Sequence, residues 1–344
     1  MSNPVAPSEA PTLTDYRVDT AGRAKPGPAA DAGRRPAHDG EIPIVDVSAL
    51  DDDTVVRRLG EACERIGFLY VVGHGIPDAV VRDAFHQTRA FFDQPEADKL
   101  AFTVDAYQRG YRRDGTITVP GYSPDVKEVF ELGVELAVNH PDVVAGKPMQ
   151  GPNQWPPLAG FRPAMESYFE AVSALGQRLL PGFARALDLP ADFFAAYHRE
   201  PTSTWRIMRY PPTPNRPGQF GTAPHTDFGT LTLLAQDDQG GLEIRLRSGE
   251  WIEAPYVPSS FIVNIGDLMA CWTNDRFTST AHRVINRSGR DRYSIPIFFN
   301  PGFETVVKCL PSCRGPDNPP RYEPIHFGTY VEALTGHIFS ASAD

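Results

Sequence analysis

The chain has 344 residues, of which 41% are hydrophobic and 22% are charged, a composition typical of a soluble globular protein. Its formal net charge of −10 argues against nucleic acid and against an anionic membrane surface as partners. No apolar run reaches the roughly 18 residues that a membrane-spanning helix needs, and the first residues lack the apolar segment of a secretory signal, so neither is expected.

Cysteine usage is light for a chain of this length. Four cysteines are too few to form a disulfide framework. Cys309 and Cys313 could form half of a zinc site, but no second pair and no nearby histidine completes it. We therefore expect reduced thiols and a cytoplasmic protein.

Residues 1–40 are rich in Pro, Ala, Gly and Asp and show no apolar periodicity. Such a segment cannot bury enough apolar surface to offset the entropy that is lost on ordering. We predict a flexible tail, with the ordered region starting at about residue 42.

The first ordered elements are predicted from the spacing of apolar residues. A short strand at 42–47 precedes a helix, in which the apolar residues from Val55 to Ile66 recur at helical spacing. The run FLYVV at 68–72 is typical of a buried strand, and a second helix is expected from about Asp78.

Residues 103–160 contain many Gly and Pro and few periodic runs, so loops are predicted to dominate this segment. Tyr111, Arg113 and Glu128 are its candidates for contacting a ligand. The alternative for each is an ordinary solvated side chain.

A long helical pattern runs from Arg162 to Leu179, and packing in the core explains its apolar stripe. Pro181 is predicted to kink or break this helix, because proline lacks the backbone N–H and clashes with the preceding turn. The rest of the chain reads as short strands separated by Gly, Asp and Ser turns, which indicates a sandwich or barrel. The predicted strands are 204–212, 231–235, 242–246, 251–254, 260–265 and 292–299.

His225 and Asp227 lie two residues apart, so a strand would direct both side chains to the same face. His282 would complete a set of two imidazoles and one carboxylate. That set leaves coordination positions open and suits a non-haem Fe(II) that activates O₂. A lone histidine is more often a core or turn residue, but the joint spacing favours a metal site.

Arg292 and Ser294 also share one face of a predicted strand, ten residues beyond His282. A guanidinium beside a hydroxyl is a good receptor for the far carboxylate of a dicarboxylic acid. Phe298 lies on the face of Ser294 and is expected to form a wall of the substrate pocket. These residues predict a site that holds both a metal and an organic acid.

Arg206 and Tyr210 share one face of the strand at 204–212. Arg206 either binds an acidic group or forms a structural ion pair. For Tyr210 the structural alternative is a core tyrosine with a satisfied hydroxyl.

Several stretches resemble the isopenicillin N synthase-like branch of the Fe(II)/2-oxoglutarate-dependent oxygenases. HTDFGTLTLLAQDDQGGLEIR at 225–245 resembles the family's first metal-ligand strand, and VNIGDLMACWTNDRFTSTAHRVIN at 263–286 resembles the segment with the distal ligand. RYSIPIFFNP at 292–301 resembles the co-substrate strand, and DVKEVFELG at 125–133 resembles part of the N-terminal region. The resemblance covers roughly residues 42–335.

This resemblance implies a mainly β protein with a double-stranded β-helix (jelly-roll) core and flanking helices. The expected regions are a tail at 1–40, an N-terminal α/β region at 41–160, and a helical scaffold with the oxygenase core at 161–340. The implied cofactor is Fe(II), with 2-oxoglutarate and O₂ as co-substrates. The implied metal ligands are His225, Asp227 and His282, and the implied 2-oxoglutarate contacts are Arg292, Ser294 and Tyr210.

The implied activity is hydroxylation, desaturation or cyclisation of a small molecule, coupled to the conversion of 2-oxoglutarate into succinate and CO₂. Arg206, Phe298 and Tyr111 are the candidate substrate contacts. Tyr111 is included because loops such as 103–160 close over the substrate in the family. An Arg-rich chain of this branch also suggests specialised metabolism, such as antibiotic biosynthesis.

Two alternatives stay open. An oxidase of the isopenicillin N synthase type uses no 2-oxoglutarate, and its Arg and Ser pair binds a carboxylate of the substrate instead. Succinate formation separates that reading from the first. The other alternative is a non-catalytic jelly-roll binding protein, against which the complete ligand set speaks.

Overall fold

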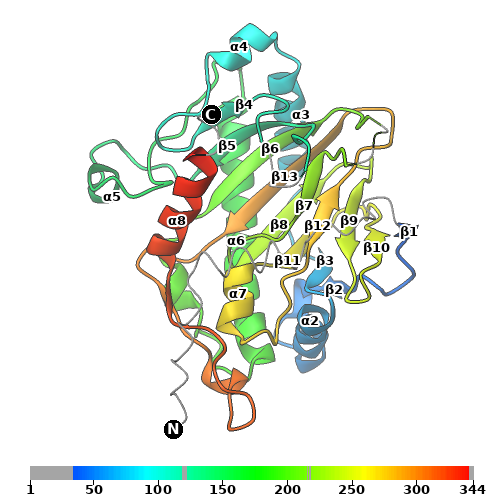
Figure 1. Cartoon of the computed structure of the whole chain (residues 1–344), viewed down its shortest axis with the longest axis vertical. Coiled ribbons are helices and arrows are strands. Elements are labelled where there is room, and N and C mark those ends of the chain that lie inside the picture. Colours follow the sequence, from blue (N-terminus) through cyan, green and yellow to red (C-terminus); the bar gives the residue numbers. More distant parts are fainter. Residues whose placement is uncertain (1–33, 118–121, 215, 217, 341–344) are drawn as a thin grey trace, which may run out of the picture.

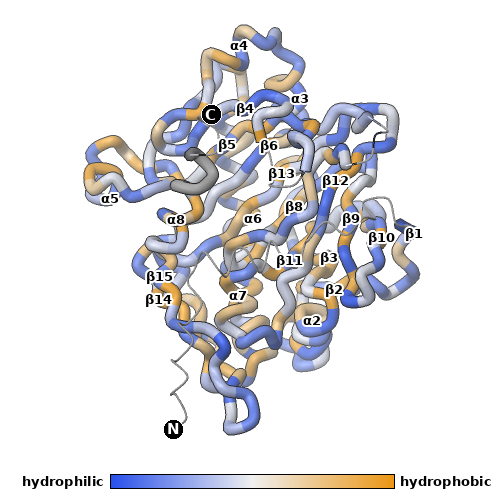
Figure 2. Tube along the Cα trace, in the orientation of Figure 1, coloured by the Kyte–Doolittle hydropathy of each residue, from blue (hydrophilic) through white to orange (hydrophobic). Residues whose placement is uncertain are grey.

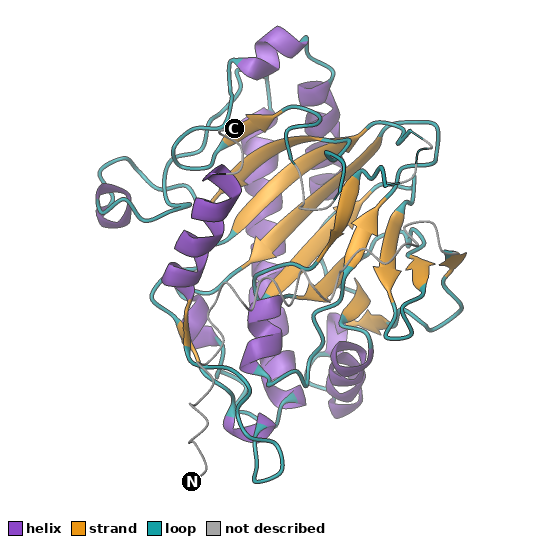
Figure 3. Cartoon of the chain, in the orientation of Figure 1, coloured by secondary structure: helices purple, strands orange, loops and turns teal. Residues whose placement is uncertain are grey.

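The computed structural model describes residues 34–117, 122–214, 216 and 218–340. Two β-sheets form its centre, and the long helix Phe161–Ala186 lies behind the larger sheet in the view of Figures 1 and 3. The larger sheet has eight strands in the order β2-β3-β11-β8-β13-β6-β5-β4, and the smaller has five in the order β1-β10-β9-β12-β7. A two-stranded sheet pairs β14 with β15.

The elements have the following bounds. The larger sheet contains β2 (Ile44–Asp46), β3 (Phe68–Val72), β4 (Gly110–Arg112), β5 (Glu128–Gly133), β6 (Thr204–Tyr210), β8 (Leu231–Gln236), β11 (Phe261–Ile265) and β13 (Arg292–Phe299). The other strands are β1 (Arg35–Pro36), β7 (Thr222–His225), β9 (Leu242–Arg245), β10 (Trp251–Glu253), β12 (His282–Val284), β14 (Val306–Val307) and β15 (Ile325–His326). The helices are α2 (Asp53–Arg65), α3 (Asp78–Phe92), α4 (Glu96–Leu100), α5 (Pro141–Val144), α6 (Phe161–Ala186), α7 (Asp267–Trp272) and α8 (Phe327–Ser340), with short 3₁₀ turns η1 (Val47–Ala49), η2 (Ala195–His198) and η3 (Pro311–Cys313).

Strand alternation divides the side chains of the larger sheet between two apolar clusters. On its outer face, residues such as Phe130 and Ile207 pack with α3 and α6. On its inner face, residues such as Val129 and Met208 pack with Ile244 of the smaller sheet. In Figure 2 the hydrophobic stretches gather on the central strands, while many outer loops are hydrophilic. This arrangement confirms the predicted jelly-roll with flanking helices.

The end of α2 anchors the segment that leads to one candidate metal ligand. Gly67 follows the helix with φ +67°, a conformation that favours glycine, and a Cβ there would lie 1.8 Å from Thr278 O. The Thr280 hydroxyl donates to Ile66 O at 2.6 Å. Because Thr280 is two residues before His282, this packing sets where β12 begins.

Of the two predicted effects of Pro181, a kink or a break, the break is wrong, because α6 continues from Phe161 to Ala186 through this proline. A proline inside a helix costs about 3 kcal/mol. Leu179, Leu180 and Phe183 on either side of it are all fully buried, and each such side chain contributes about 1.5–3 kcal/mol. Burial of the helix therefore outweighs the cost of the proline.

The segment predicted to consist of loops contains two strands of the larger sheet, β4 and β5. All six residues of β5 are buried, including its two glutamates. Glu128 is paired with Lys99 at 2.5 Å, and Glu131 is paired with Arg206 at 2.7 Å. These charges interrupt the apolar pattern that would have indicated a strand, and their partners lie far away in the sequence.

The predicted tail extends too far, because residues 34–40 are part of the fold. β1 pairs in parallel with β10, and Arg35 forms ion pairs with Glu41 at 2.5 Å and with Glu250 at 3.1 Å. These contacts use the backbone and charges, so apolar periodicity could not reveal them. The remainder of the predicted tail, residues 1–33, lies outside the described residues.

All four cysteines are free, as expected. Within the described ranges, no helix has both the length and the apolar character required to cross a membrane.

Candidate active site

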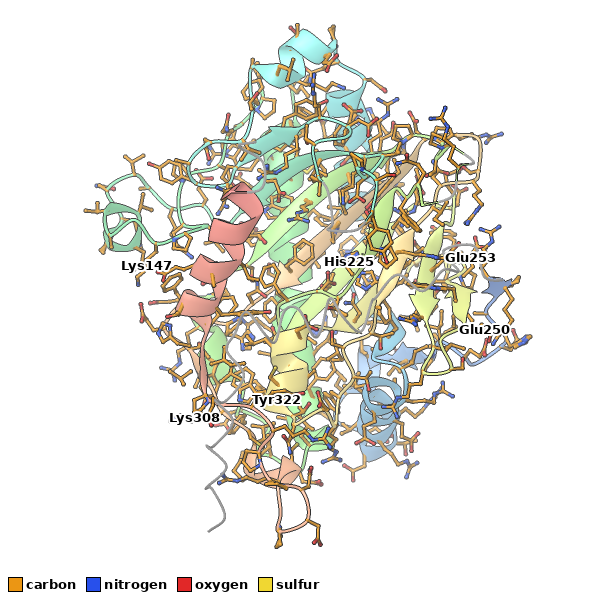
Figure 4. The ribbon with its side chains drawn as sticks, in the orientation of Figure 1. Lys147, His225, Glu250, Glu253, Lys308 and Tyr322 are labelled. Atoms are coloured by element: carbon orange, nitrogen blue, oxygen red, sulfur yellow. The ribbon has the colours of Figure 1, made fainter. Side chains whose placement is uncertain are left out.

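Three candidate metal ligands converge between the two sheets. His225 ends β7, and His282 begins β12 directly across from it. His225 Nε2 lies 3.7 Å from Asp227 Oδ1, and His282 Nε2 lies 3.8 Å from Asp227 Oδ2. The ligand atoms of all three residues lie within 4.8 Å of one another, and Figure 4 marks the position of His225. A single ion could therefore contact all three.

Backbone carbonyls orient the two imidazoles. His225 Nδ1 lies 2.9 Å from Ala223 O, and His282 Nδ1 lies 3.1 Å from Thr280 O. A carbonyl oxygen only accepts hydrogen bonds, so each Nδ1 carries a proton, and in the neutral ring each Nε2 keeps its lone pair. Both lone pairs are thus available to a metal.

Two residues of the larger sheet hold the carboxylate. Asp227 Oδ2 accepts hydrogen bonds from Thr232 Oγ1 at 2.6 Å and from Asn264 Nδ2 at 2.8 Å. Thr232 belongs to β8 and Asn264 to β11, whereas the histidines belong to the smaller sheet. Outer contacts of this kind fix the orientation of a metal ligand, and they leave Oδ1 free to bind.

The electrostatics favour the neutral form of His225 and the ionised form of Asp227. Burial, and then the neighbouring His282, lower the pKa of His225 to about 3, so this imidazole is neutral at pH 7. Burial raises the pKa of Asp227, but the two imidazoles and the hydrogen bonds from Asn264 and Thr232 lower it more, to a value below its usual range. Neutral imidazole and ionised carboxylate are the donors that bind divalent iron.

Arg292 forms a second part of the site. It is only 1% exposed, and its guanidinium lies 4.9 Å from the centre of the Tyr210 ring, across from it on β6. Arg292 Nε donates to Gly240 O at 2.7 Å, and Nη2 donates to Gln236 Oε1 at 3.0 Å. Nη1 is buried and has no hydrogen-bond partner in the described part of the chain. Because an unpaired charged donor is costly to bury, this geometry suits an anionic ligand.

Ser294 shares the face of Arg292 and lies opposite Met208 of β6. The Tyr210 hydroxyl donates to Met208 Sδ at 3.2 Å and accepts from Thr222 Oγ1 at 3.4 Å. Thr222 is three residues before His225 on β7. These two hydroxyls therefore connect β6, the strand beside Arg292, with β7, the strand that carries His225.

Arg206 and Phe298 lie together on the inner face. The Arg206 guanidinium is 5.1 Å from the centre of the Phe298 ring, and Phe298 is opposite the Thr232 that holds Asp227. Arg206 Nε donates to Glu131 Oε2 at 2.7 Å, so the structural ion pair exists. Among the described residues its two terminal nitrogens have no hydrogen-bond partner, and 33% of the side chain is exposed. Arg206 thus forms a structural ion pair through Nε, and its two terminal nitrogens stay available to a ligand.

Tyr111 lies outside this site, so its prediction as a substrate contact is wrong. It is 2% exposed and packs edge-on against Phe91 of α3, at 5.9 Å between ring centres. Its hydroxyl donates to Glu128. Because strand residues alternate, the next residue, Arg112, is the one on the inner face.

Sequence reasoning missed three charged residues that the structure places near the site: Arg112, Lys127 and Glu131. Arg112 lies 3.6 Å from Glu131, which in turn holds Arg206. Lys127, just before β5, is buried beside Thr222 at 3.1 Å. Recognition of β5 would have put Glu131 on the inner face, but no sequence signal relates Lys127 to Thr222.

Comparisons with known proteins agree with this geometry. A model described as the non-haem dioxygenase in morphine synthesis N-terminal region matches residues 42–158, and the 2OG-Fe(II) oxygenase superfamily model matches residues 194–301. The 2-oxoglutarate-Fe(II) type oxidoreductase hxnY of Emericella nidulans is 37% identical over 283 residues, which are 79% of this chain and 81% of that protein. Homoarginine-6-hydroxylase 2-ODD-233 of Oryza sativa is 34% identical over 322 residues, or 86% and 98% of the two chains.

A solved structure gives the same result. A full-length Neurospora crassa protein in complex with alpha-KG and thymine superposes with a TM-score of 0.77 at 28% identity, covering 88% of this chain and 98% of that one.

A jelly-roll that brings two histidines and one aspartate together defines the non-haem iron oxygenases. This chain belongs to the 2OG-Fe(II) oxygenase superfamily, with Fe(II) and 2-oxoglutarate as in that family. The described residues fit both. The imidazole lone pairs and Asp227 Oδ1 suit iron, and the unpaired Nη1 of Arg292 suits a carboxylate.

Proposed function

We propose that this enzyme hydroxylates a small-molecule metabolite that carries a carboxylate. In the proposed reaction the substrate, 2-oxoglutarate and O₂ give the alcohol, succinate and CO₂. His225, Asp227 and His282 bind Fe(II), and Arg292, Ser294 and Tyr210 bind 2-oxoglutarate. The observation that supports this most is the buried Nη1 of Arg292, which has no hydrogen-bond partner among the described residues. Arg292 lies beside Tyr210, whose hydroxyl is hydrogen-bonded to Thr222 of the metal-ligand strand.

The chain's own residues position the reactants. Iron, when bound, supplies the O₂-dependent oxidation. Arg292 offers a charged donor to the C5 carboxylate of 2-oxoglutarate, and charge-assisted hydrogen bonds of this kind are strong and directional. Ser294 and Tyr210 add neutral donors, and the apolar inner cluster around Met208 limits access of water.

The substrate side of the site is built around Arg206. Its terminal nitrogens form a planar fork that matches a carboxylate, and Glu131 fixes the guanidinium through Nε. Phe298, under the guanidinium, offers an apolar surface to the rest of the substrate. Two of the proteins named above are a homoarginine hydroxylase and a protein solved with thymine, so small polar molecules of different kinds suit this fold.

The test is a turnover assay with Fe(II), 2-oxoglutarate and a panel of small carboxylic acids, each paired with its methyl ester. The expected result is succinate together with a product heavier by one oxygen, from acids and not from esters. Arg206→Met should abolish the preference for acids and leave 2-oxoglutarate binding unchanged. Product without succinate would indicate an oxidase instead, and equal turnover of acids and esters would refute the carboxylate requirement.

We further propose that the enzyme works in the cytoplasm and in specialised metabolism such as antibiotic biosynthesis. The free thiols support a reducing compartment, which an Fe(II) site also requires.

A further inference from the structure

Lys127 is a buried cation that belongs neither to the proposed metal ligands nor to the proposed 2-oxoglutarate contacts. It is 5% exposed and lies in the segment just before β5. Its Nζ is 2.9 Å from Asp125 Oδ2 and donates to Thr222 Oγ1 at 3.1 Å. Asp125 Oδ1 in turn accepts from the backbone N of Ala223 at 2.9 Å. A buried ammonium is costly unless it is paired, so these contacts hold Lys127 firmly against β7.

The hydrogen bonds that start at Lys127 run in one direction. An ammonium can only donate, so Thr222 accepts from it and directs its own proton to the Tyr210 oxygen, 3.4 Å away. Tyr210 must then donate elsewhere, and its partner is Met208 Sδ at 3.2 Å. A thioether is a weak acceptor. The series of donors therefore ends in a hydroxyl proton without a strong acceptor.

A second donor without an acceptor lies next to the first. Arg292 is opposite Tyr210 in the sheet, and its guanidinium lies over the Tyr210 ring at 4.9 Å. Its Nη1 is buried and unpaired among the described residues. A carboxylate placed here would accept from both and would displace the thioether from Tyr210, because hydrogen bonds to charged groups are the stronger ones.

We propose that Lys127 is a positioning residue for 2-oxoglutarate. Through Thr222 it fixes the Tyr210 hydroxyl as a donor towards the co-substrate carboxylate, without touching the co-substrate itself. This inference rests on the proposed function, in which Arg292 and Tyr210 bind 2-oxoglutarate.

A double-mutant cycle tests this relay, that is, the hydrogen bonds from Lys127 through Thr222 to Tyr210. The dissociation constant for 2-oxoglutarate is measured by calorimetry on the anaerobic Fe(II) protein, for Lys127→Met, Tyr210→Phe and the double variant. Each single change should weaken binding about tenfold, the effect of one hydrogen bond to a charged group. The double variant should bind 2-oxoglutarate no more than about tenfold more weakly than the wild type, because Lys127 has nothing to act on once the Tyr210 hydroxyl is absent. Fe(II) affinity should change less than about twofold.

Two further variants control for loss of a buried charge. Lys99→Met removes a lysine that is also 5% exposed but is paired with Glu128 on the outer face, so 2-oxoglutarate affinity should not change. Thr222→Val interrupts the relay and leaves the Lys127–Asp125 pair intact, so it should weaken binding about tenfold. If Lys127→Met does not fold, Thr222→Val decides the matter.

The relay is refuted if Thr222→Val binds 2-oxoglutarate normally, if the double variant loses about a hundredfold as independent effects would, or if Lys99→Met loses as much as Lys127→Met. Arg292→Ala separates this outcome from failure of the proposed function. Normal 2-oxoglutarate binding in Arg292→Ala refutes the co-substrate site itself, whereas weak binding there with normal binding in the relay variants refutes only the relay.

Discussion

Asn264 donates from Nδ2 to Oδ2 of Asp227 at 2.8 Å, so a residue in the larger sheet sets the orientation of a metal ligand that follows a strand of the smaller one. Thr232 donates to the same oxygen at 2.6 Å. With Oδ2 held twice, the carboxylate cannot rotate freely, and Oδ1 stays beside the His225 imidazole.

Removal of Asn264 should therefore weaken iron binding although it is not a ligand. Asn264→Ala is expected to lower Fe(II) affinity about 10- to 100-fold, the range for outer contacts of metal ligands. Thr232→Val should act in the same direction. Anaerobic Fe(II) titration checks this, with Asn318→Ala as a surface control of the same residue type. Equal Fe(II) affinity in Asn264→Ala and wild type would contradict it.

Arg292 should matter for 2-oxoglutarate and hardly for iron. Loss of one partner of a buried, hydrogen-bonded charge pair costs about 2–5 kcal/mol, so Arg292→Ala should weaken 2-oxoglutarate binding by well over tenfold. Arg292→Lys keeps the charge but loses the forked guanidinium and the hydrogen bond to Gly240 O, so it should restore 2-oxoglutarate binding only in part. Ser294→Ala should lose less, because a neutral donor is removed. Titration of each variant with 2-oxoglutarate decides the order.

The N-terminal segment should contribute to stability from residue 34 onwards. A chain that lacks residues 1–40 loses β1 and the ion pairs of Arg35, whereas one that lacks residues 1–33 keeps them. Partly exposed ion pairs contribute about 0.2–1 kcal/mol each to the free energy of unfolding. The chain that lacks residues 1–40 should therefore unfold at a temperature a few degrees lower. Thermal unfolding of the two deletions gives the comparison. Identical midpoints would mean that β1 adds nothing measurable.

His198 should make stability depend on pH. Burial lowers the pKa of His198 from 6.5 to about 4, although a hydrogen bond to Phe194 O partly opposes the shift. The folded state therefore prefers the neutral ring. The contribution of His198 to the free energy of unfolding is fully present above pH 6.5 and is lost as the pH drops towards 4. His198→Phe should remove up to about 3 kcal/mol of this dependence. Denaturant unfolding between those pH values measures it, and parallel pH profiles of the two proteins would exclude a role for His198.

The parts of the fold that sequence could predict are those with local signals. Apolar spacing identified α2, α3, β3 and β13, and the two-residue spacing of His225 and Asp227 identified strand neighbours on one side of the metal. Both signals depend only on the geometry of a single element.

The missed features depend on contacts between distant residues. β5 was hidden because Glu131 interrupts its apolar pattern, and the partner that makes its burial possible, Arg206, is 75 residues away. Tyr111 was placed in the pocket because no strand was predicted around it, so its face was undetermined. The Lys127–Thr222 contact spans 95 residues, and one sequence alone carries no information on such a pair.

The most direct test of the metal centre is succinate formation from 2-oxoglutarate by His225→Ala, Asp227→Ala and His282→Ala, measured beside Fe(II) affinity and thermal unfolding. All three variants should fold, bind Fe(II) weakly and form no succinate above background. Undiminished Fe(II) affinity and activity in all three would place the iron elsewhere and contradict the assignment of these residues as its ligands.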